Sequence, residues 1–153
     1  DSYKGEKFSH ASAIKRCLDF KNVNVVSFGI RNLSKSEMDF YDNNRNRIKI
    51  FWGKDKSDYD ITEIEKIFEN KTVYITFDVD GFDASVMPAT GTPEPGGLFW
   101  EDVLPIIKKV CQVSNVVGAD INELAPIKNF NSYNFLVAKL AYKILAYTFE
   151  FKN

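Results

Sequence analysis

The sequence predicts an α/β fold of three layers, in which helices cover both faces of a mainly parallel β-sheet. Segments with the periodicity of strands alternate with segments with the periodicity of helices along the chain. This alternation favours parallel strands joined by crossover helices over an α+β arrangement. The 153 residues suit one domain, and the 44% hydrophobic content is sufficient for a core.

The first half of the chain is predicted to hold three helices and two strands. In order, these are a helix at Ser9–Phe20, a strand at Val23–Ile30, a helix at Ser34–Asn43, a strand at Ile48–Trp52 and a helix at Asp60–Glu69. Ser9 is a suitable N-cap for the first helix. The spacing Ser34-x-x-Glu37 is that of a capping box, which indicates where the second helix begins.

The second half continues the alternation. Its predicted elements are a strand at Val73–Val79, a loop at Gly81–Gly97, a helix at Trp100–Cys111, a strand at Asn115–Ile121 and a helix at Ser132–Phe149. Val73–Val79 is rich in β-branched and aromatic residues, which is typical of a buried strand. One stripe of the last helix is expected to pack on the sheet. It consists of Leu136, Val137, Leu140, Ala141, Ile144 and Leu145.

Composition argues against several classes of protein. The formal charge of -1 and the pI near 5.9 do not favour nucleic acid as a partner. No apolar stretch approaches the ~20 residues that span a bilayer, so a cytoplasmic protein is expected.

Cys17 and Cys111 both fall in apolar helical patterns, which predicts two buried, reduced thiols. The chain opens at Asp1 in loop-like sequence without a first strand, which suggests that an N-terminal part is absent.

Two carboxylates mark the end of the Val73–Val79 strand. Because side chains alternate along a strand, Asp78 and Asp80 are expected to project to the same side. In open α/β sheets, ligands bind at the carboxyl ends of the strands. Two neighbouring negative charges need a cation, a shared proton or open water. The pair therefore predicts a metal site at this edge.

Two other chemistries could use an Asp78-x-Asp80-Gly81 sequence. A calcium-binding EF-hand loop needs glycine at its sixth position and glutamate at its twelfth, and neither is present. A haloacid-dehalogenase-like phosphatase would use Asp78 as the nucleophile and Asp80 as the acid/base. The segment Gly118–Glu123 slightly resembles the late metal-binding motif of that family. However, Phe82 stands where that family usually has Thr or Val.

A longer set of motifs resembles the ureohydrolase (arginase/agmatinase) family, and most closely the agmatinases. Four motifs occur in the same order as in that family, and together they span nearly the whole chain. They are Asp1-Ser-Tyr-x-Gly-Glu-Lys-Phe-Ser-His-Ala11, Phe28-Gly-Ile-Arg31, Phe77-Asp-Val-Asp-Gly-Phe-Asp83 with Met87-Pro-Ala-Thr-Gly-Thr-Pro-Glu-Pro-Gly-Gly97, and Gly118-Ala-Asp-Ile-Asn-Glu-Leu-Ala-Pro126. The resemblance implies an arginase-like fold, of which residues 1–153 form the C-terminal part.

The resemblance also implies a binuclear Mn²⁺ enzyme that hydrolyses a guanidinium to urea and an amine. By position, Asp78 and Asp80 become metal ligands, Glu123 pairs with the guanidinium, and His10 passes a proton to the leaving amine. Asp83 is expected to support the metal-binding residues without binding the metal itself. Oxygen ligands suit Mn²⁺, which agrees with these residues. A homo-oligomer, trimeric or hexameric, and a role in polyamine biosynthesis follow from the same resemblance.

The chain also departs from the family pattern. The other metal ligands of the family lie in upstream Gly-Gly-Asp-His and Asp-x-His-x-Asp motifs, and His10 is the only histidine here. The chain alone is therefore not expected to hold two metal ions, and a non-catalytic remnant stays an alternative. Arginase-type members carry an acid that binds an α-ammonium where this sequence has Asn32 and Ser34. This favours agmatine over arginine, with guanidinobutyrate as another possibility.

Overall fold

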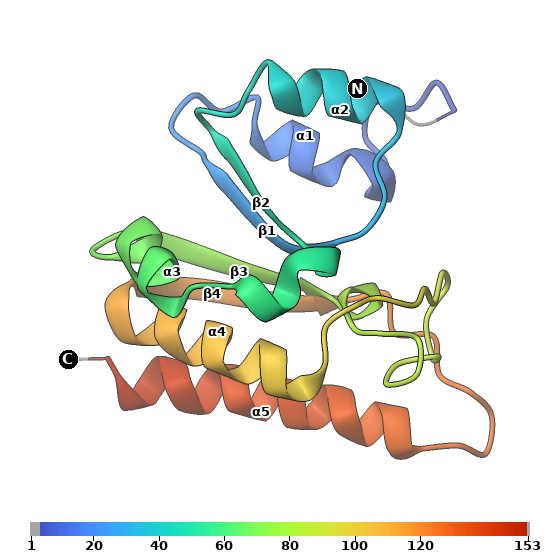
Figure 1. Ribbon diagram of the computed structural model, residues 1–153. Helices are drawn as coiled ribbons and strands as arrows, with labels where there is room; N and C mark the ends of the chain where they lie inside the picture. The colour runs from blue at the N-terminus through green and yellow to red at the C-terminus, as the bar shows by residue number, and fades with distance from the viewer. Residues whose placement is uncertain (1–3, 153) are drawn as a thin grey trace.

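A computed structural model describes residues 4–152 and contains two pairs of parallel strands (Figure 1). Strand β1 (Val25–Ile30) pairs with β2 (Ile48–Trp52), and β3 (Thr72–Asp78) pairs with β4 (Asn115–Asn122). Within the described residues, no backbone ladder joins one pair to the other. The two pairs meet at their carboxyl ends, where β1 contacts the turn that follows β3.

The helices alternate with these strands. They are η1 (His10–Ser12), α1 (Ala13–Cys17), α2 (Lys35–Asp42), η2 (Gly53–Asp58), α3 (Ile61–Phe68), η3 (Val79–Gly81), α4 (Trp100–Val113) and α5 (Ser132–Glu150). The predicted capping box is confirmed, because the Ser34 side chain accepts from the Glu37 N–H and the Glu37 carboxylate accepts from the Ser34 N–H. The predicted helix at Ser9–Phe20 is shorter and begins as a 3₁₀ turn.

Helices lie on both faces of the β1–β2 pair (Figure 1). Helix α2 packs on one face, where the rings of Tyr41 and Trp52 meet edge to face at 6.2 Å. On the other face, Phe28 stacks on Phe51 at 4.6 Å, and both rings belong to a cluster with Ile64 of α3. Alternating side chains of two parallel strands therefore fill two interfaces, and the predicted α/β class is confirmed.

The β3–β4 pair is covered on one face only. Helices α4 and α5 pack against that face, as Figure 1 shows. On β3, positions 72, 74, 76 and 78 are exposed, while 73, 75 and 77 are half-buried. The prediction of a buried strand at Val73–Val79 is therefore wrong in this chain, since nothing covers its second face among residues 4–152. Tyr74 keeps 59% of its surface exposed there.

The long loop after β3 is part of the core. Phe82, Met87 and Ala89 are at most 1% exposed and pack with Val103 and Ile107 of α4. This irregular segment is therefore held by apolar packing as well as by its hydrogen bonds. Because it is held in place, it can position side chains at the carboxyl end of β3.

Two predictions about buried side chains need correction. On α5, Leu140 and Ile144 are buried as expected, but Leu145 is 57% exposed because it points away from the sheet. Cys17 is exposed, which contradicts the prediction, whereas Cys111 is buried as expected. Among residues 4–152, no helix combines the length and the apolar character needed to cross a membrane. The Asp1–Tyr3 part of the first motif lies outside the described residues.

Candidate active site

Asp78 is the last residue of β3 and the N-cap of the turn η3. Its carboxylate accepts the backbone N–H of Asp80 at 2.9 Å. Asp80 therefore lies in a 3₁₀ turn rather than on the strand, and the expected strand alternation between the two residues is wrong. The turn forms because the Asp78 side chain satisfies an N–H that the strand ladder no longer pairs. The carboxyl groups are brought near each other by this turn.

The carboxylate of Asp80 is held by two threonines of the long loop. The hydroxyls of Thr90 and Thr92 donate to its two oxygens, one each. Thr90 also donates to the backbone carbonyl of Glu123 at 3.0 Å. The sequence interpretation did not identify these threonines, although Thr90-Gly-Thr92 stands inside the quoted motif. Their hydroxyls fix the direction of the Asp80 carboxylate.

Glu123 directly follows β4 and has a φ of +65°. This conformation is uncommon for a residue with a side chain, and it is tolerated here because neighbouring contacts hold the backbone. Besides the Thr90 contact, the N–H of Ala125 donates to the carbonyl of Ala89 at 2.9 Å. The loop after β3 is thus joined to the chain after β4 at Glu123 and again at Ala125.

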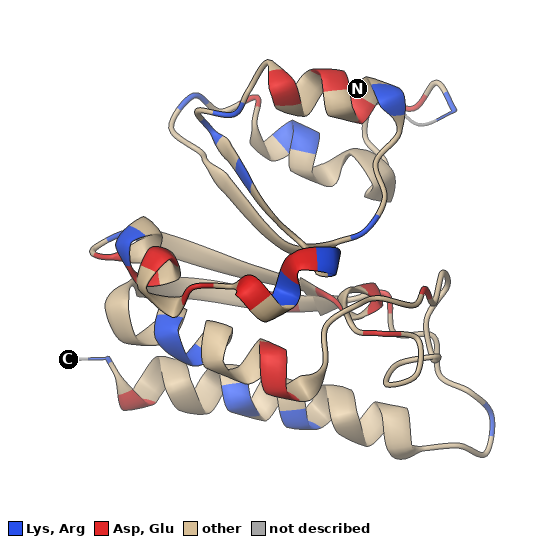
Figure 2. Cartoon of the chain, in the orientation of Figure 1, with Lys and Arg blue, Asp and Glu red and all other residues tan. Residues whose placement is uncertain are grey.

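Electrostatics indicate that these three carboxyl groups share one region. Partial desolvation raises the pKa of Asp78, and the negative charges of Asp80 and Glu123 raise it further. The N–H of Asp80 and the Arg31 guanidinium oppose this effect. Figure 2 shows acidic residues gathered where β3 passes into the long loop. The mutual repulsion is of the kind that a bound cation relieves.

The donor set fits part of a divalent metal site. Asp78 and Asp80 supply the hard oxygen atoms that Mn²⁺ accepts, and their repulsion favours a cation. However, within residues 4–152 no group of three or more His, Cys, Asp and Glu side chains is arranged to hold a metal ion. Among residues 4–152, the donors that fit a metal ion are therefore the two carboxylates at this sheet edge.

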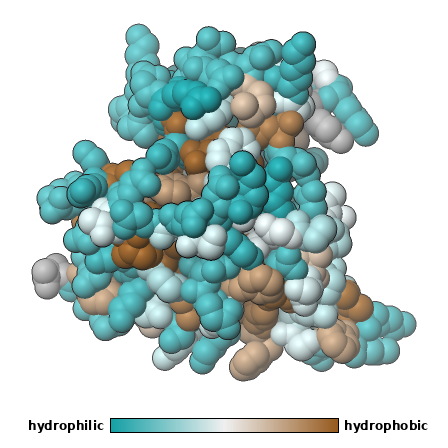
Figure 3. Space-filling view, viewed as in Figure 1, coloured by the Kyte–Doolittle hydropathy of each residue, from teal (hydrophilic) through white to brown (hydrophobic). Residues whose placement is uncertain are grey.

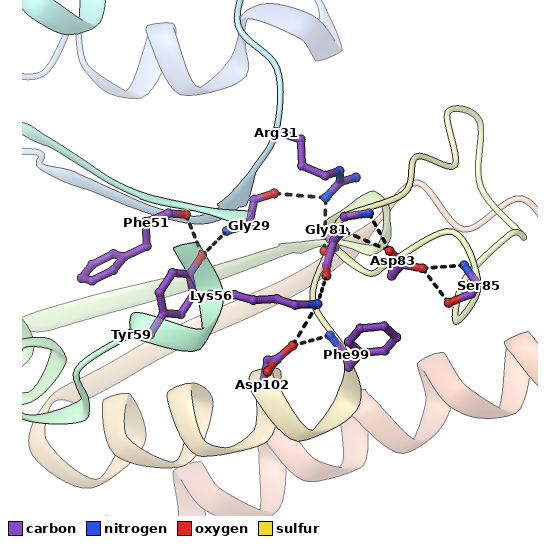
Figure 4. A network of polar contacts seen from close by, with 12 residues as sticks. Gly29, Arg31, Phe51, Lys56, Tyr59, Gly81, Asp83, Ser85, Phe99 and Asp102 are labelled. Carbon is purple, nitrogen blue, oxygen red and sulfur yellow. Dashed lines mark hydrogen bonds and ion pairs between the residues drawn. The ribbon is translucent and has the colours of Figure 1, made fainter. Parts of the chain in front are cut away.

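Asp83 accepts hydrogen bonds from donors within the long loop, such as Ser85 (Figure 4). One of its oxygens accepts the N–H and the hydroxyl of Ser85, and the other accepts the N–H groups of Gly96 and Gly97. Asp83 is only 9% exposed. The hydrogen bonds from Ser85, followed by those from Gly96 and Gly97, lower the pKa of Asp83 from 3.8 to about 2.

Arg31 connects the two strand pairs at their carboxyl ends (Figure 4). Its guanidinium donates to the carbonyls of Gly29 at 3.0 Å, of Asp80 at 2.5 Å and of Gly81 at 3.4 Å. Its Nε lies 3.8 Å from a Glu94 carboxylate oxygen. One side chain thereby ties β1 to the turn that carries Asp80.

The remaining predicted residues lie elsewhere. His10 begins η1, which runs directly into α1, and α1 lies on the other side of the β1–β2 pair from β3 and β4 (Figure 1). The structure therefore does not bring it to the three carboxyl groups. Ser34 is engaged as the N-cap of α2. Asn32 donates through its amide to Glu94 in the long loop.

Comparison with known proteins identifies the family. The model of the arginase family matches residues 1–147. The chain belongs to the arginase family. It is 34% identical over 149 residues to N(1)-aminopropylagmatine ureohydrolase of Synechocystis sp., covering 96% of this chain and 48% of that protein. It is 34% identical to the agmatinase of Pyrococcus horikoshii, covering 95% of this chain and 50% of that protein.

A solved structure and a third sequence relative agree with this family assignment. The agmatine ureohydrolase of Thermoplasma volcanium superposes with a TM-score of 0.80 at 33% identity, over 96% of this chain and 50% of that one. Human mitochondrial guanidino acid hydrolase is 34% identical over 146 residues, covering 90% of this chain and 41% of that protein. The chain thus spans about half the length of the arginase-family relatives it matches. The predicted arginase-like fold and ureohydrolase family are confirmed, and the comparisons give no support to the phosphatase alternative.

Proposed function

We propose that this chain is the C-terminal half of a ureohydrolase that converts agmatine to putrescine and urea at a binuclear Mn²⁺ centre. The observation that supports this most is the convergence of the Asp78, Asp80 and Glu123 charges at one sheet edge in an arginase-family fold. When bound, the two metal ions would supply a hydroxide nucleophile at neutral pH. A role in cytoplasmic polyamine biosynthesis, in a trimeric or hexameric enzyme, belongs to the same proposal.

In this proposal each site residue has its own task. Asp78 and Asp80 bind metal through their carboxylates, and the hydroxyls of Thr90 and Thr92 keep the Asp80 carboxylate in one orientation. Glu123 pairs with the substrate guanidinium, because a planar cation with several donors matches a carboxylate. His10 passes a proton to the leaving amine, which requires that it approach the site in the complete enzyme.

The substrate proposed is a guanidino compound without an α-ammonium group. Asn32 and Ser34 stand where an acid would recognise the ammonium of arginine, and neither carries a negative charge. The names of the similar proteins cover aminopropylagmatine, agmatine and guanidino acids, so the guanidinium is their shared feature. Agmatine is the first substrate to test, followed by aminopropylagmatine and guanidinobutyrate.

The deciding experiment supplies the half that the relatives have and this chain does not span. The chain is co-expressed with the N-terminal half of the Synechocystis relative, and Mn²⁺ content and urea release from agmatine are measured. We expect negligible urea release from the chain alone, because most ligands and the bound hydroxide are missing. The reconstituted complex should bind two Mn²⁺ ions and release urea.

Two variants test the assigned roles in that complex. Asp80→Asn should abolish turnover and lower metal content, because the amide lacks the charge that balances the metal. Asp42→Asn is the matched control, since Asp42 makes an exposed ion pair with Arg45 far from the site. His10→Asn should lower turnover more than metal content.

A complex that holds two metal ions without releasing urea from any of the three substrates would support the non-catalytic alternative. Full activity of Asp80→Asn with two metal ions would rule out Asp80 as a ligand.

A further inference from the structure

Glu123, the proposed partner of the guanidinium, is held at its backbone by two residues of the long loop. Its own carbonyl accepts from the Thr90 hydroxyl at 3.0 Å, and two positions later the N–H of Ala125 donates to the carbonyl of Ala89 at 2.9 Å. The φ of Glu123, +65°, is unfavourable for a residue with a side chain unless neighbouring contacts oppose the strain. The Glu123 side chain is exposed, so the backbone determines where its carboxylate begins.

The Thr90 hydroxyl contacts two groups that belong to different parts of the site. One is a carboxylate oxygen of Asp80, 10 positions earlier in the chain, and the other is the carbonyl of Glu123, 33 positions later. A hydroxyl has a single proton, so these two acceptors share one donor. The hydroxyl therefore connects the residue proposed to bind metal with the residue proposed to bind substrate.

Thr90 and Thr92 differ in burial and in the groups that they contact. Thr90 is 9% exposed, whereas Thr92 lies on an exposed part of the loop and donates to the other carboxylate oxygen of Asp80. Most of the face seen in Figure 3 is hydrophilic or of intermediate hydropathy, and water competes for hydrogen bonds at such a surface. A buried hydroxyl keeps its partners, and a bond left unmade there is costly. Thr92 is thus a matched comparison, since it orients Asp80 without a hydrogen bond to Glu123 among residues 4–152.

We propose that Thr90 is a positioning residue for the substrate as well as for the metal, because its hydroxyl fixes the Glu123 backbone and thereby the direction of the Glu123 carboxylate. This role rests on the proposed function, in which Glu123 pairs with the guanidinium. A planar guanidinium binds best when both oxygens of its partner lie in its plane, so a small rotation of the Glu123 backbone weakens the pairing. Substrate affinity should therefore depend on Thr90 and far less on Thr92.

Three variants separate this role from a general effect on the loop. Thr90→Val keeps nearly the shape of threonine and removes the hydroxyl, and Thr92→Val does the same two positions later. Thr90→Ser keeps the hydroxyl and loses a methyl group, so it should restore what Thr90→Val loses. Circular dichroism and thermal unfolding of each variant check that the fold is retained.

Hydrogen exchange of the chain alone tests whether Thr90 holds the Glu123 backbone. The N–H of Ala125 reports on this backbone, because its bond to the Ala89 carbonyl lies two residues beyond Glu123. We expect its exchange to be about fivefold faster or more in Thr90→Val, since a buried hydrogen bond is lost, and unchanged in Thr90→Ser and Thr92→Val. Unchanged exchange in Thr90→Val, or an equal rise in Thr92→Val, would overturn the proposal.

Kinetics of the reconstituted complex at saturating Mn²⁺ test the effect on the substrate. The KM for agmatine should be about fivefold or more higher in Thr90→Val than in Thr92→Val, with a smaller difference in kcat. Both variants should weaken Mn²⁺ binding by roughly tenfold, because each removes a donor that orients the Asp80 carboxylate. Thr90→Ser should have the KM of the unaltered chain.

Two results in the complex would overturn the proposal. One is an equal KM in Thr90→Val and Thr92→Val, and the other is a raised KM that Thr90→Ser does not restore. A complex of the unaltered chain that releases no urea would contradict the proposed function instead. The exchange of the Ala125 N–H would then decide alone whether Thr90 holds the Glu123 backbone.

Discussion

Asp83 shows how one buried carboxylate can order a loop that has no regular structure. Its two oxygens accept four hydrogen bonds from Ser85, Gly96 and Gly97, and thereby connect residues 13 and 14 positions apart. A carboxylate with this many donors prefers to stay ionised. The role follows from the donors around Asp83, which a linear motif does not reveal.

Acid should therefore weaken the loop. The folded pKa of Asp83, about 2, is below the ordinary value of 3.8. The stabilisation is thus fully present above pH 4 and is lost as the pH falls through about 2. Asp83→Asn should cost about 2 kcal/mol near neutral pH, because an amide hydrogen would face donors. Urea denaturation of both proteins between pH 6 and pH 2.5 measures this. A difference that does not shrink with acidification would contradict the assignment.

Two glycines of the same loop provide a matched pair. A Cβ on Gly97 would lie 2.5 Å from the backbone of Phe82 and Asp83, whereas a Cβ on Gly91 meets nothing within 4 Å. We expect Gly97→Ala to destabilise the fold by about 2 kcal/mol, since backbone atoms would have to shift. Gly91→Ala should be close to neutral. Thermal unfolding of the two variants compares them directly, and equal melting temperatures would mean that the loop yields without cost.

At the scale of elements, the junction between the strand pairs depends on a few polar contacts. Arg31 donates to carbonyls of both β1 and η3 (Figure 4). The Tyr59 hydroxyl accepts the N–H of Gly29 at 3.3 Å and donates to the carbonyls of Phe51 and Trp52 at the end of β2. Gly29 has a φ of +76°, and β1 changes register there. The bend brings the end of β1 against the turn that carries Asp80.

Replacing Arg31 should loosen this junction. Arg31→Lys keeps the charge but cannot reach several carbonyls with a rigid fork of donors, so we expect a loss of about 1–3 kcal/mol. Arg45→Lys should change stability by less than about 0.5 kcal/mol, because its ion pair with Asp42 is exposed. Hydrogen exchange at residues 80–82 should accelerate only in Arg31→Lys. Unchanged exchange there would show that apolar packing alone holds the turn.

Most elements of this fold could be predicted from periodicity. The strand at Ile48–Trp52 has the predicted bounds, and the Ser34–Glu37 capping box was visible in four residues because its chemistry is local. The 3₁₀ turn at Val79–Gly81 could not be predicted, since it depends on where the Asp78 side chain bonds. The exposure of β3 and of Leu145 could not be predicted either, because periodicity indicates an apolar face without indicating what covers it.

At the scale of the whole molecule, the substrate preference should depend on one position. In the reconstituted complex, kcat/KM should favour agmatine over arginine by roughly a hundredfold or more, since the α-ammonium and α-carboxylate lack partners in this half. Ser34→Asp should improve the use of arginine, and aspartate also caps helices, so α2 should remain intact. Steady-state kinetics on both substrates decides this. Equal use of arginine by the unaltered protein would mean that the other half recognises the amino-acid end.

The pairing of each strand with the next one along the chain has a consequence for folding kinetics. β1 and β2 are separated only by α2 and its turns, and β3 and β4 only by the long loop and α4. Paired residues are 22 or 23 positions apart in β1–β2 and 43 or 44 apart in β3–β4, so β1–β2 is the more local pair and is expected to close first. The contacts of Arg31 with residues 80 and 81 span 49 and 50 positions, so they form only after both pairs exist. The edge that gathers the carboxylates is therefore expected to be the last part of the chain to become ordered.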